Sequence, residues 1–176
     1  KRPFVVILGG AKVSDKIALV ENLIKKADTI LIGGGMAYTF LKSLGKGVGN
    51  SKLEADKVAI AKNLLDQAKK AGVLIELTSD FLVVQKFDAP QTKKIVKEIP
   101  DGWESLDIGP ETQKRFKDIL SNAKTIVWNG PVGVFEIDAY ADGTKAVAKH
   151  LATLKDALTI VGGGDSAAAV SKFGVD

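Results

Sequence analysis

Four glycine-rich segments, each following a hydrophobic run, are the part of this sequence most able to do chemistry. They lie in the strings VVILGGAK, TILIGGGMAYTF, TIVWNGPVGVFE and LTIVGGGDSAAA. Glycine lets the backbone approach a ligand closely, and a following helix offers free N–H groups to an anion. These turns therefore favour a phosphate ligand, although one glycine at a strand-to-helix turn often serves only tight packing. The fingerprints G-x-x-x-x-G-K-[ST] and G-x-G-x-x-G do not occur, so a phosphate site here would be built differently.

Two lysines follow the first of these turns. Lys12 and Lys16 are four residues apart, which places both ammonium groups on one face of a helix if the chain is already helical there. Positive charge at a helix start opposes the helix dipole, so a compensating anion is expected. Either lysine could instead be an ordinary solvated residue. We expect at least one exposed ammonium group to face the crevice and contact a phosphate.

Polar side chains at the later turns suggest further contacts. Asp165 begins the segment after the last glycine turn, where it either caps a helix or holds Mg²⁺, an ion that prefers one or two carboxylates together with phosphate oxygens. Its neighbour Ser166 would serve equally well as the cap. Asn129 and Glu136 flank the turn at Pro131–Phe135. Glu136 is either a solvated or capping residue or an acceptor for ribose hydroxyl groups.

Six hydrophobic runs predict the strands that position these turns. They are Phe4–Leu8, Thr29–Ile32, Val73–Leu77, Phe81–Val84, Thr125–Trp128 and Leu158–Val161. Continuous runs without alternation indicate a parallel sheet that is covered on both faces. We predict an α/β fold, a Rossmann-like three-layer αβα arrangement with a mostly parallel six-stranded sheet, over residues 1–176 as a single nucleotide-binding domain. Ligands of such sheets bind at the carboxyl ends of the strands, so the four turns should converge on one crevice.

Helical spacing of apolar residues fills the gaps between several runs. The helical segments are expected around residues 17–24 and 58–68, and at Pro110–Leu120 and Ala139–Leu154. Gly45–Asn50 is expected to be a polar loop, and residues 88–103 give mixed helix and turn signals. Met36, Tyr38 and Phe40 are interpreted as core or pocket wall, and Trp128 as packing under the end of the sheet.

The composition excludes several classes of function. With no Cys and one His, disulfides, thiol nucleophiles and Cys-containing zinc sites are ruled out. The net charge of +4 comes from Lys and Arg that are interspersed with Asp and Glu, so no nucleic-acid partner is expected. No tract is apolar enough for a membrane span, and no signal peptide opens the chain. A cytoplasmic protein without a membrane partner is the expectation.

The combined motifs resemble those of the phosphoglycerate kinase family. They are GGAKVSDK, GGGMAYTF, LDIGPET, WNGPVGVFE and GGGDSAAA, and the likeness runs in order through essentially all 176 residues. It covers only the carboxyl-terminal, nucleotide-binding half of that enzyme. The resemblance implies reversible phosphoryl transfer from 1,3-bisphosphoglycerate to ADP in glycolysis, giving 3-phosphoglycerate and ATP, with Mg²⁺ as cofactor.

The resemblance also implies roles for particular residues. Lys16 would hold the nucleotide phosphates, Lys12 would meet the phosphoryl group in flight, and Asp165 would coordinate Mg²⁺. Donors at the helix start would come from Gly163, Gly164 and Ser166. Glu136 would bind the ribose, and the nucleotide would be lined by Asn129, Pro131 and Val132. The adenine slot would lie near Gly34, Gly35, Phe87, Leu106 and Ser105, the last standing where relatives often carry Gly.

The likeness predicts a fragment rather than a whole enzyme. The phosphoglycerate-binding amino-terminal half and the carboxyl-terminal tail are absent from the chain, which begins at Lys1 and stops at Asp176. We therefore expect a monomer that binds Mg-nucleotide without significant turnover. Two alternatives remain at this point: a dinucleotide domain of an oxidoreductase, whose G-x-G-x-x-G fingerprint is missing, and a binding or structural module whose glycines serve packing alone.

Overall fold

The main sheet of the computed structural model, which describes residues 1–174, is parallel and has the order β3-β2-β1-β7-β8. Its strands are β1 (Phe4–Leu8), β2 (Thr29–Ile32), β3 (Leu74–Glu76), β7 (Thr125–Asn129) and β8 (Leu158–Gly162). The central strand β1 pairs with β2 on one side and with β7 on the other. The α/β fold with a mostly parallel sheet, expected from the continuous apolar runs, is confirmed.

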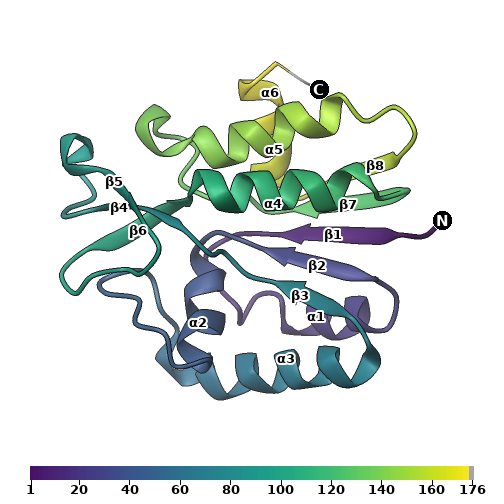
Figure 1. The fold of residues 1–176 in the computed structure, drawn as a ribbon, viewed down its shortest axis with the longest axis horizontal. Helices are drawn as coiled ribbons and strands as arrows, with labels where there is room; N and C mark the ends of the chain where they lie inside the picture. The colour runs from purple at the N-terminus through teal and green to yellow at the C-terminus, as the bar shows by residue number, and fades with distance from the viewer. Residues whose placement is uncertain (175–176) are drawn as a thin grey trace.

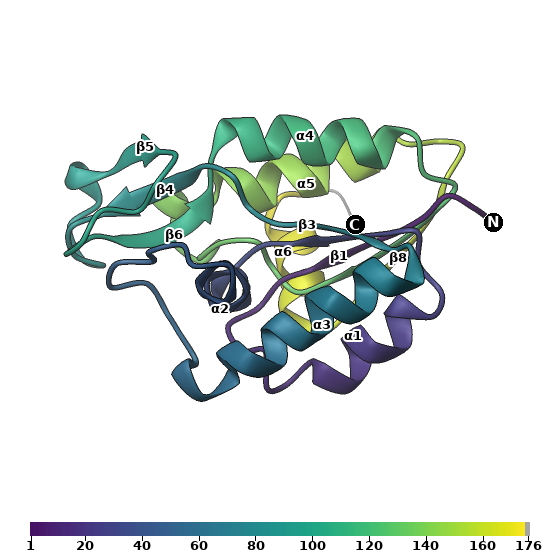
Figure 2. The ribbon, with the colours of Figure 1, turned by 60° about the horizontal axis from the view of Figure 1, so that its bottom comes forward.

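Helices cover both faces of this sheet (Figures 1 and 2). One face carries α1 (Ile17–Ile24), α2 (Gly35–Ser43) and α3 (Val58–Ala71). The other carries α4 (Pro110–Ser121), α5 (Asp142–Ala152) and α6 (Gly164–Lys172). Single turns of 3₁₀ helix lie at η1 (Ala55–Lys57), η2 (Pro90–Thr92) and η3 (Asp138–Tyr140). The three layers predicted from the alternating patterns are therefore present.

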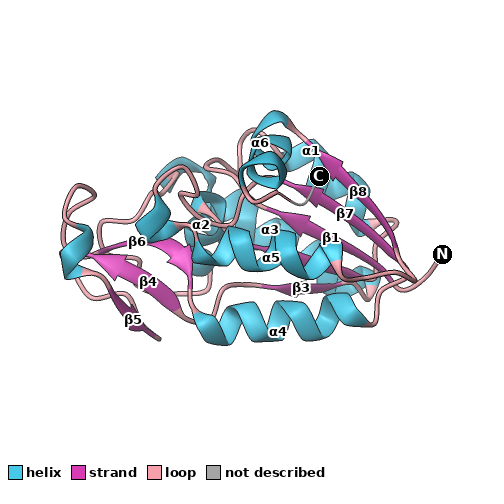
Figure 3. Cartoon of the chain, turned by 90° about the horizontal axis from the view of Figure 1, so that it is seen from above, coloured by secondary structure: helices cyan, strands magenta, loops and turns pink. Residues whose placement is uncertain are grey.

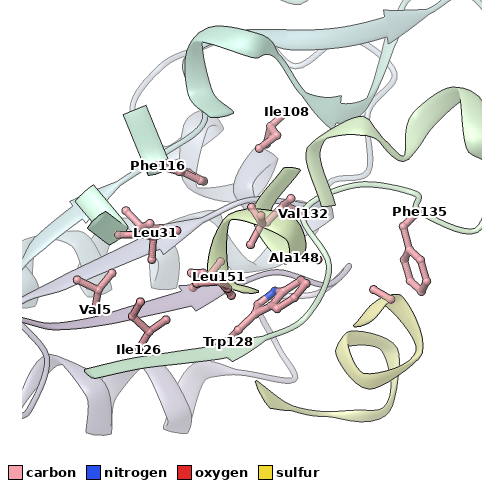
Figure 4. Close-up of a cluster of buried hydrophobic side chains, with 14 of the residues drawn as sticks. Val5, Leu31, Ile108, Phe116, Ile126, Trp128, Val132, Phe135, Ala148 and Leu151 are labelled. Carbon is pink, nitrogen blue, oxygen red and sulfur yellow. The ribbon is translucent and has the colours of Figure 1, made fainter. Parts of the chain in front are cut away.

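Each face of the sheet has its own hydrophobic core. The cluster beneath α4, α5 and α6 contains Phe116, Trp128 and Leu151 (Figure 4). Trp128 is fully buried, as predicted, and its indole Nε1–H donates to the carbonyl oxygen of Gly130 at 2.8 Å. The opposite cluster includes Met36 and Phe40 of α2, which confirms their assignment to the core. Both helical layers are thus packed against the strands whose ends carry the glycine turns.

A second, antiparallel sheet extends from one end of the first (Figures 1 and 3). It has the order β5-β4-β6 and contains β4 (Phe81–Val84), β5 (Lys94–Val96) and β6 (Glu104–Ile108). The prediction that Phe81–Val84 is the sixth strand of the main sheet was wrong. This run is continuously apolar because Phe81 and Val83 face one cluster while Leu82 and Val84 face another. It is buried on both faces, as a strand of the main sheet would be.

Two buried aspartates connect the second sheet to the helices of the first. Asp80, just before β4, accepts the backbone N–H groups of Glu111 at 2.9 Å and Thr112 at 2.8 Å, at the start of α4. Asp107 in β6 accepts the N–H of Gly143 in α5 at 2.8 Å. Burial raises the pKa of the Asp107 carboxyl, and the backbone N–H groups of Gly143 and Ile108 oppose that rise. The two carboxylates therefore fix how the small sheet sits against α4 and α5.

The strand arrows of the main sheet point toward the small sheet (Figures 1 and 3). The glycine turns therefore lie between the two sheets, at the carboxyl ends of the parallel strands. The segment Gly45–Asn50 is a loop, as expected. Within residues 1–174, the helices are all too short or too polar to cross a membrane.

Candidate functional site

The turns after β1 and β7 bind each other through the backbone. The N–H of Gly9 donates to the carbonyl oxygen of Asn129 at 2.9 Å, and the N–H of Gly10 donates to that of Pro131 at 3.0 Å. A Cβ at Gly9 or at Gly34, in the turn after β2, would collide with the Pro131 carbonyl. Packing alone therefore explains these glycines, and the same packing brings three turns to one place.

The fourth turn, which leads from β8 into α6, is open. A Cβ added at Gly164 would meet no atom within 4 Å, and the N-cap residue Gly163 has φ 86°. The cap position supplies no side-chain hydrogen bond to the helix. Ser166 does not act as the cap that the sequence suggested, because its Oγ accepts the N–H of Gly130 at 2.6 Å. The first N–H groups of α6 and the exposed carboxylate of Asp165 therefore face the crevice without the packing found at the other turns.

Lys16 is the N-cap residue of α1 and is not yet helical, so the expected helical face with Lys12 does not exist. Its ammonium group is half-buried rather than exposed. The Nζ atom donates to the carbonyl oxygen of Gly9 at 2.6 Å and to the backbone and side-chain oxygens of Asn129 at 3.1 and 2.8 Å. Burial lowers the pKa of Lys16, while the negative charges of Asp15 and Asp165 raise it. This lysine ties two turns together beside the crevice.

A hollow of about 340 Å³, here called the lysine hollow, lies among the turns after β1, β7 and β8. Lys12 is exposed and lines it together with Lys16. The remaining lining residues are Gly10, Ala11, Asp15, Asn129, Gly130, Pro131, Gly163, Gly164, Asp165 and Ser166. Both lysines therefore line one space, as expected from the sequence. A turn before α1 brings them together, and not the helix that their spacing of four residues suggested.

A second hollow of about 360 Å³, here called the aromatic hollow, lies toward the small sheet. It shares Gly10, Ala11, Pro131 and Asp165 with the lysine hollow, so the two spaces are contiguous. The rest of its wall consists of Gly34, Gly35, Tyr38, Lys52, Phe87, Glu104, Ser105, Leu106, Gly133, Val134 and Glu136. A ligand with a charged end and a flat apolar end could therefore occupy both spaces at once.

Aromatic contacts support the wall of this second hollow. The rings of Phe87 and Tyr140 lie 5.9 Å apart, and the Tyr140 hydroxyl donates to the Phe87 carbonyl oxygen at 2.6 Å. The Phe87 side chain is 47% exposed, which leaves its ring available for stacking. Across the hollow, the buried Tyr38 hydroxyl donates to Ser105 Oγ at 2.7 Å. Tyr38 is thus both core and pocket wall, as interpreted from the sequence.

The hollows bring together the residues proposed from the sequence, with one exception. Val132 is fully buried in the core and lines neither hollow, although it packs over Gly33 at the edge of the site. Sequence reasoning also missed Lys52 and Glu104, two charged residues in the wall of the aromatic hollow. They belong to segments without any motif. The contact that brings them together, from the Ser105 N–H to Ser51 Oγ at 2.9 Å, spans 54 positions of the chain.

The comparison with protein families shows to which family the chain belongs. The phosphoglycerate kinase family model matches residues 1–176. The chain belongs to the phosphoglycerate kinase family. It is 56% identical to the phosphoglycerate kinase of Lactiplantibacillus plantarum and 54% identical to that of Fervidobacterium nodosum. These alignments cover 99% of the chain and 43% and 45% of the two relatives, so the chain spans less than half of their length.

Solved structures of this family agree with the fold. The phosphoglycerate kinase of Coxiella burnetii superimposes with a TM-score of 0.93 at 38% sequence identity. That of Pyrococcus horikoshii superimposes with a TM-score of 0.77 at 32% identity. Each match covers 99% of this chain and 45% of the solved one.

Proposed function

We propose that this chain is the ADP- and ATP-binding half of a phosphoglycerate kinase. The intact enzyme would transfer a phosphoryl group reversibly between 1,3-bisphosphoglycerate and ADP, giving 3-phosphoglycerate and ATP. The observation that carries the proposal is the continuity of the two hollows. A polyphosphate in the lysine hollow leaves the attached base within reach of the aromatic hollow, whose wall includes Glu136 as the proposed ribose ligand.

The lysine hollow supports phosphate binding through charge and backbone donors. The exposed ammonium group of Lys12 is proposed to meet the phosphoryl group in flight. Lys16 is proposed to hold the nucleotide phosphates through its positive charge, because its three N–H donors already bind oxygens of Gly9 and Asn129. The open N–H groups at Gly163 and Gly164 add the positive end of the α6 dipole. Phosphoryl transfer depends on such positioning and charge neutralisation more than on acid–base chemistry, which suits a site without His or Cys.

Asp165 fits the role of Mg²⁺ ligand. Its exposed carboxylate lines both hollows. Its negative charge acts to raise the pKa of Lys16, which places the two groups near each other. Mg²⁺ prefers one or two carboxylates together with phosphate oxygens, and Asp165 offers one at the point where phosphates would lie. When bound, the metal would neutralise phosphate charge. Asp165 would hold it beside the helix start.

The curated relatives are more than twice as long as this chain, which limits the reaction that the chain could carry out alone. We propose that residues 1–176 form a single nucleotide-binding domain of a cytoplasmic, monomeric enzyme, whose phosphoglycerate-binding domain is the missing partner. Phosphoryl transfer gains most from holding both reactants in line, an advantage of about 10⁵–10⁸ M in effective concentration. This chain would orient only the nucleotide, so it should bind Mg-ADP or Mg-ATP without significant turnover.

Thermal denaturation with different nucleotides tests the proposal. Mg-ADP and Mg-ATP should raise the melting temperature, because a ligand at a hundredfold excess over its Kd stabilises the native state by about 2.7 kcal/mol. NAD at the same concentration should leave it unchanged, since the dinucleotide fingerprint is missing. A melting temperature that saturating Mg-nucleotide does not move would favour a purely structural module, and a rise with NAD alone would favour an oxidoreductase domain.

A further inference from the structure

The wall of the aromatic hollow contains two charged residues, Lys52 and Glu104, that the proposed function does not explain. The part of the wall here called the base end is formed by Lys52, Phe87, Glu104 and Leu106, none of which lines the lysine hollow. The inference that follows rests on the proposed function, because phosphates in the lysine hollow would place the nucleotide base here. Phe87 and Leu106 supply apolar surface for the faces of a purine. The edge of the purine would then meet the two charged residues.

The hydroxyl groups near the base end are already occupied. Ser105 Oγ accepts the Tyr38 hydroxyl at 2.7 Å and donates to the Asp107 carbonyl oxygen at 3.4 Å. Because a hydroxyl carries a single proton, Ser105 has no donor left for a base. Lys52 and Glu104 are the charged side chains that line this end among residues 1–174. The ammonium group can only donate hydrogen bonds, and the carboxylate can only accept them.

Glu104 is partly buried in the wall of the aromatic hollow. Burial raises its pKa, and the nearby positive charge of Lys52 opposes that rise. Its negative charge in turn contributes to the raised pKa of both Tyr38 and Tyr140, which belong to α2 and η3. The Glu104 carboxylate is therefore near enough to Lys52, Tyr38 and Tyr140 to interact with them, in the same hollow as Phe87 and Leu106.

Purine bases differ at the edge that would face this pair. Guanine presents an acceptor, O6, beside two donors, N1–H and the N2 amino group. Adenine presents the opposite pattern, an amino donor at C6 beside an acceptor at N1. A carboxylate accepts both guanine donors while an ammonium group donates to O6. The same two side chains would set the lone pair of adenine N1 against a carboxylate and the adenine amino group against an ammonium group.

We propose that Glu104 and Lys52 select a 6-oxopurine base, so that the chain binds guanine nucleotides more tightly than adenine nucleotides. The selection combines attraction for guanine with repulsion of adenine, which is how polar sites discriminate most strongly. ADP remains a ligand, because the phosphate, ribose and stacking contacts do not depend on the base edge. Inosine nucleotides carry O6 and N1–H but lack the N2 amino group, and they bind with intermediate affinity.

Calorimetric titration of the chain with Mg-ADP, Mg-IDP and Mg-GDP tests this selection. We expect the Kd to fall in that order, with Mg-GDP about tenfold tighter than Mg-ADP, as one charge-assisted hydrogen bond can produce. Glu104→Gln should bring the two affinities within about twofold, because an amide can both donate and accept. Lys52→Met should weaken Mg-GDP binding and leave Mg-ADP binding unchanged or tighter. The exposed Glu98 lies outside the base end, so Glu98→Gln is the matched control and should keep the wild-type ratio.

The outcomes separate this inference from the function on which it rests. Tighter binding of Mg-ADP than of Mg-GDP by the wild-type chain overturns the selection and leaves the proposed nucleotide site standing. A Glu104→Gln variant that is folded by circular dichroism and keeps the tenfold ratio also overturns it. If none of the three nucleotides binds, both the selection and the proposed function fail.

Discussion

Lys16 illustrates how a binding residue can also be a structural one. Its ammonium group donates to oxygens of Gly9 and Asn129, which belong to turns after two different strands. The same group lines the lysine hollow. Removing it would leave the turns less firmly joined and would also remove a positive charge from the proposed phosphate site. Lys12 lines the same hollow but is exposed. Its substitution should therefore affect phosphate binding and leave stability almost unchanged.

We predict that Lys16→Met lowers the free energy of unfolding by about 1–3 kcal/mol, the cost of losing charge-assisted hydrogen bonds at a half-buried site. Its affinity for Mg-ADP should also fall, by about 10- to 100-fold. Lys12→Met is the matched control and should change stability by less than about 0.5 kcal/mol. Urea unfolding and calorimetry of both variants measure these effects. Equal stability of the two variants would contradict the structural role of Lys16.

His150 is the one histidine of the chain, so its titration can be isolated. Burial lowers its pKa below the ordinary value of 6.5, with Lys117 and Asp118 close enough to affect it and Ser121 Oγ 3.0 Å from its Nε2. The fold therefore favours the neutral ring. Between the lowered pKa and 6.5 the His150 ring binds more protons in the unfolded chain, so its contribution to stability rises with pH through this window and is constant above it.

We predict that this pH-dependent gain in stability disappears in His150→Gln. Urea unfolding of both proteins at about pH 5 and about pH 8 measures it, and the wild type should gain more on going to the higher pH than the variant does. Other titrating groups are common to both proteins and cancel in the comparison. A variant that gains as much as the wild type would mean that His150 titrates alike in the folded and unfolded chain.

At the scale of elements, the sequence predicts a strand where burial on both faces requires a continuous run of apolar residues. The runs at Phe4–Leu8 and Thr29–Ile32 are strands because both of their faces are covered, and continuous apolarity reports this directly. β5 and β6 were missed because Lys94–Val96 and Glu104–Ile108 mix charged and apolar residues. Which sheet β4 joins is a question of long-range pairing, and the local pattern of Phe81–Val84 contains no information about it.

The buried carboxylate of Asp80 gives a prediction for the junction of the two sheets. Asp80→Ala should lower the free energy of unfolding by about 3 kcal/mol, since it removes the cap of α4 and leaves buried donors of Thr112 unpaired. Asp80→Asn keeps one acceptor oxygen and should restore part of that loss. Asp66→Ala, which removes an exposed ion pair with Lys62, is the control and should cost less than about 0.5 kcal/mol. Urea unfolding that ranks Asp80→Ala with the control would contradict the capping role.

At the scale of the whole molecule, no single motif forms the site, because its walls come from both the parallel sheet and the antiparallel sheet. The glycine turns and the lysines could be predicted because each motif follows its own strand, and parallel strands end at one edge. The base end could not, because Lys52 and Glu104 reach the aromatic hollow only through the antiparallel sheet and the loop that packs on it. The family resemblance supplied the remaining roles, and the fold brings all of those residues except Val132 to the walls of the two hollows.

The most direct test of where the nucleotide lies is to map amide shifts in the NMR spectrum of the ¹⁵N-labelled chain on addition of Mg-ADP. We predict that the largest shifts come from the turns around both hollows, at Gly10, Gly35, Leu106, Gly164 and Asp165. The hollow between α4 and α5, which is lined by Lys145 and Lys149, provides the internal comparison and should stay unchanged. Shifts concentrated at Lys145 and Lys149, or no shifts at saturating Mg-ADP, would contradict the assignment of the nucleotide to the glycine turns.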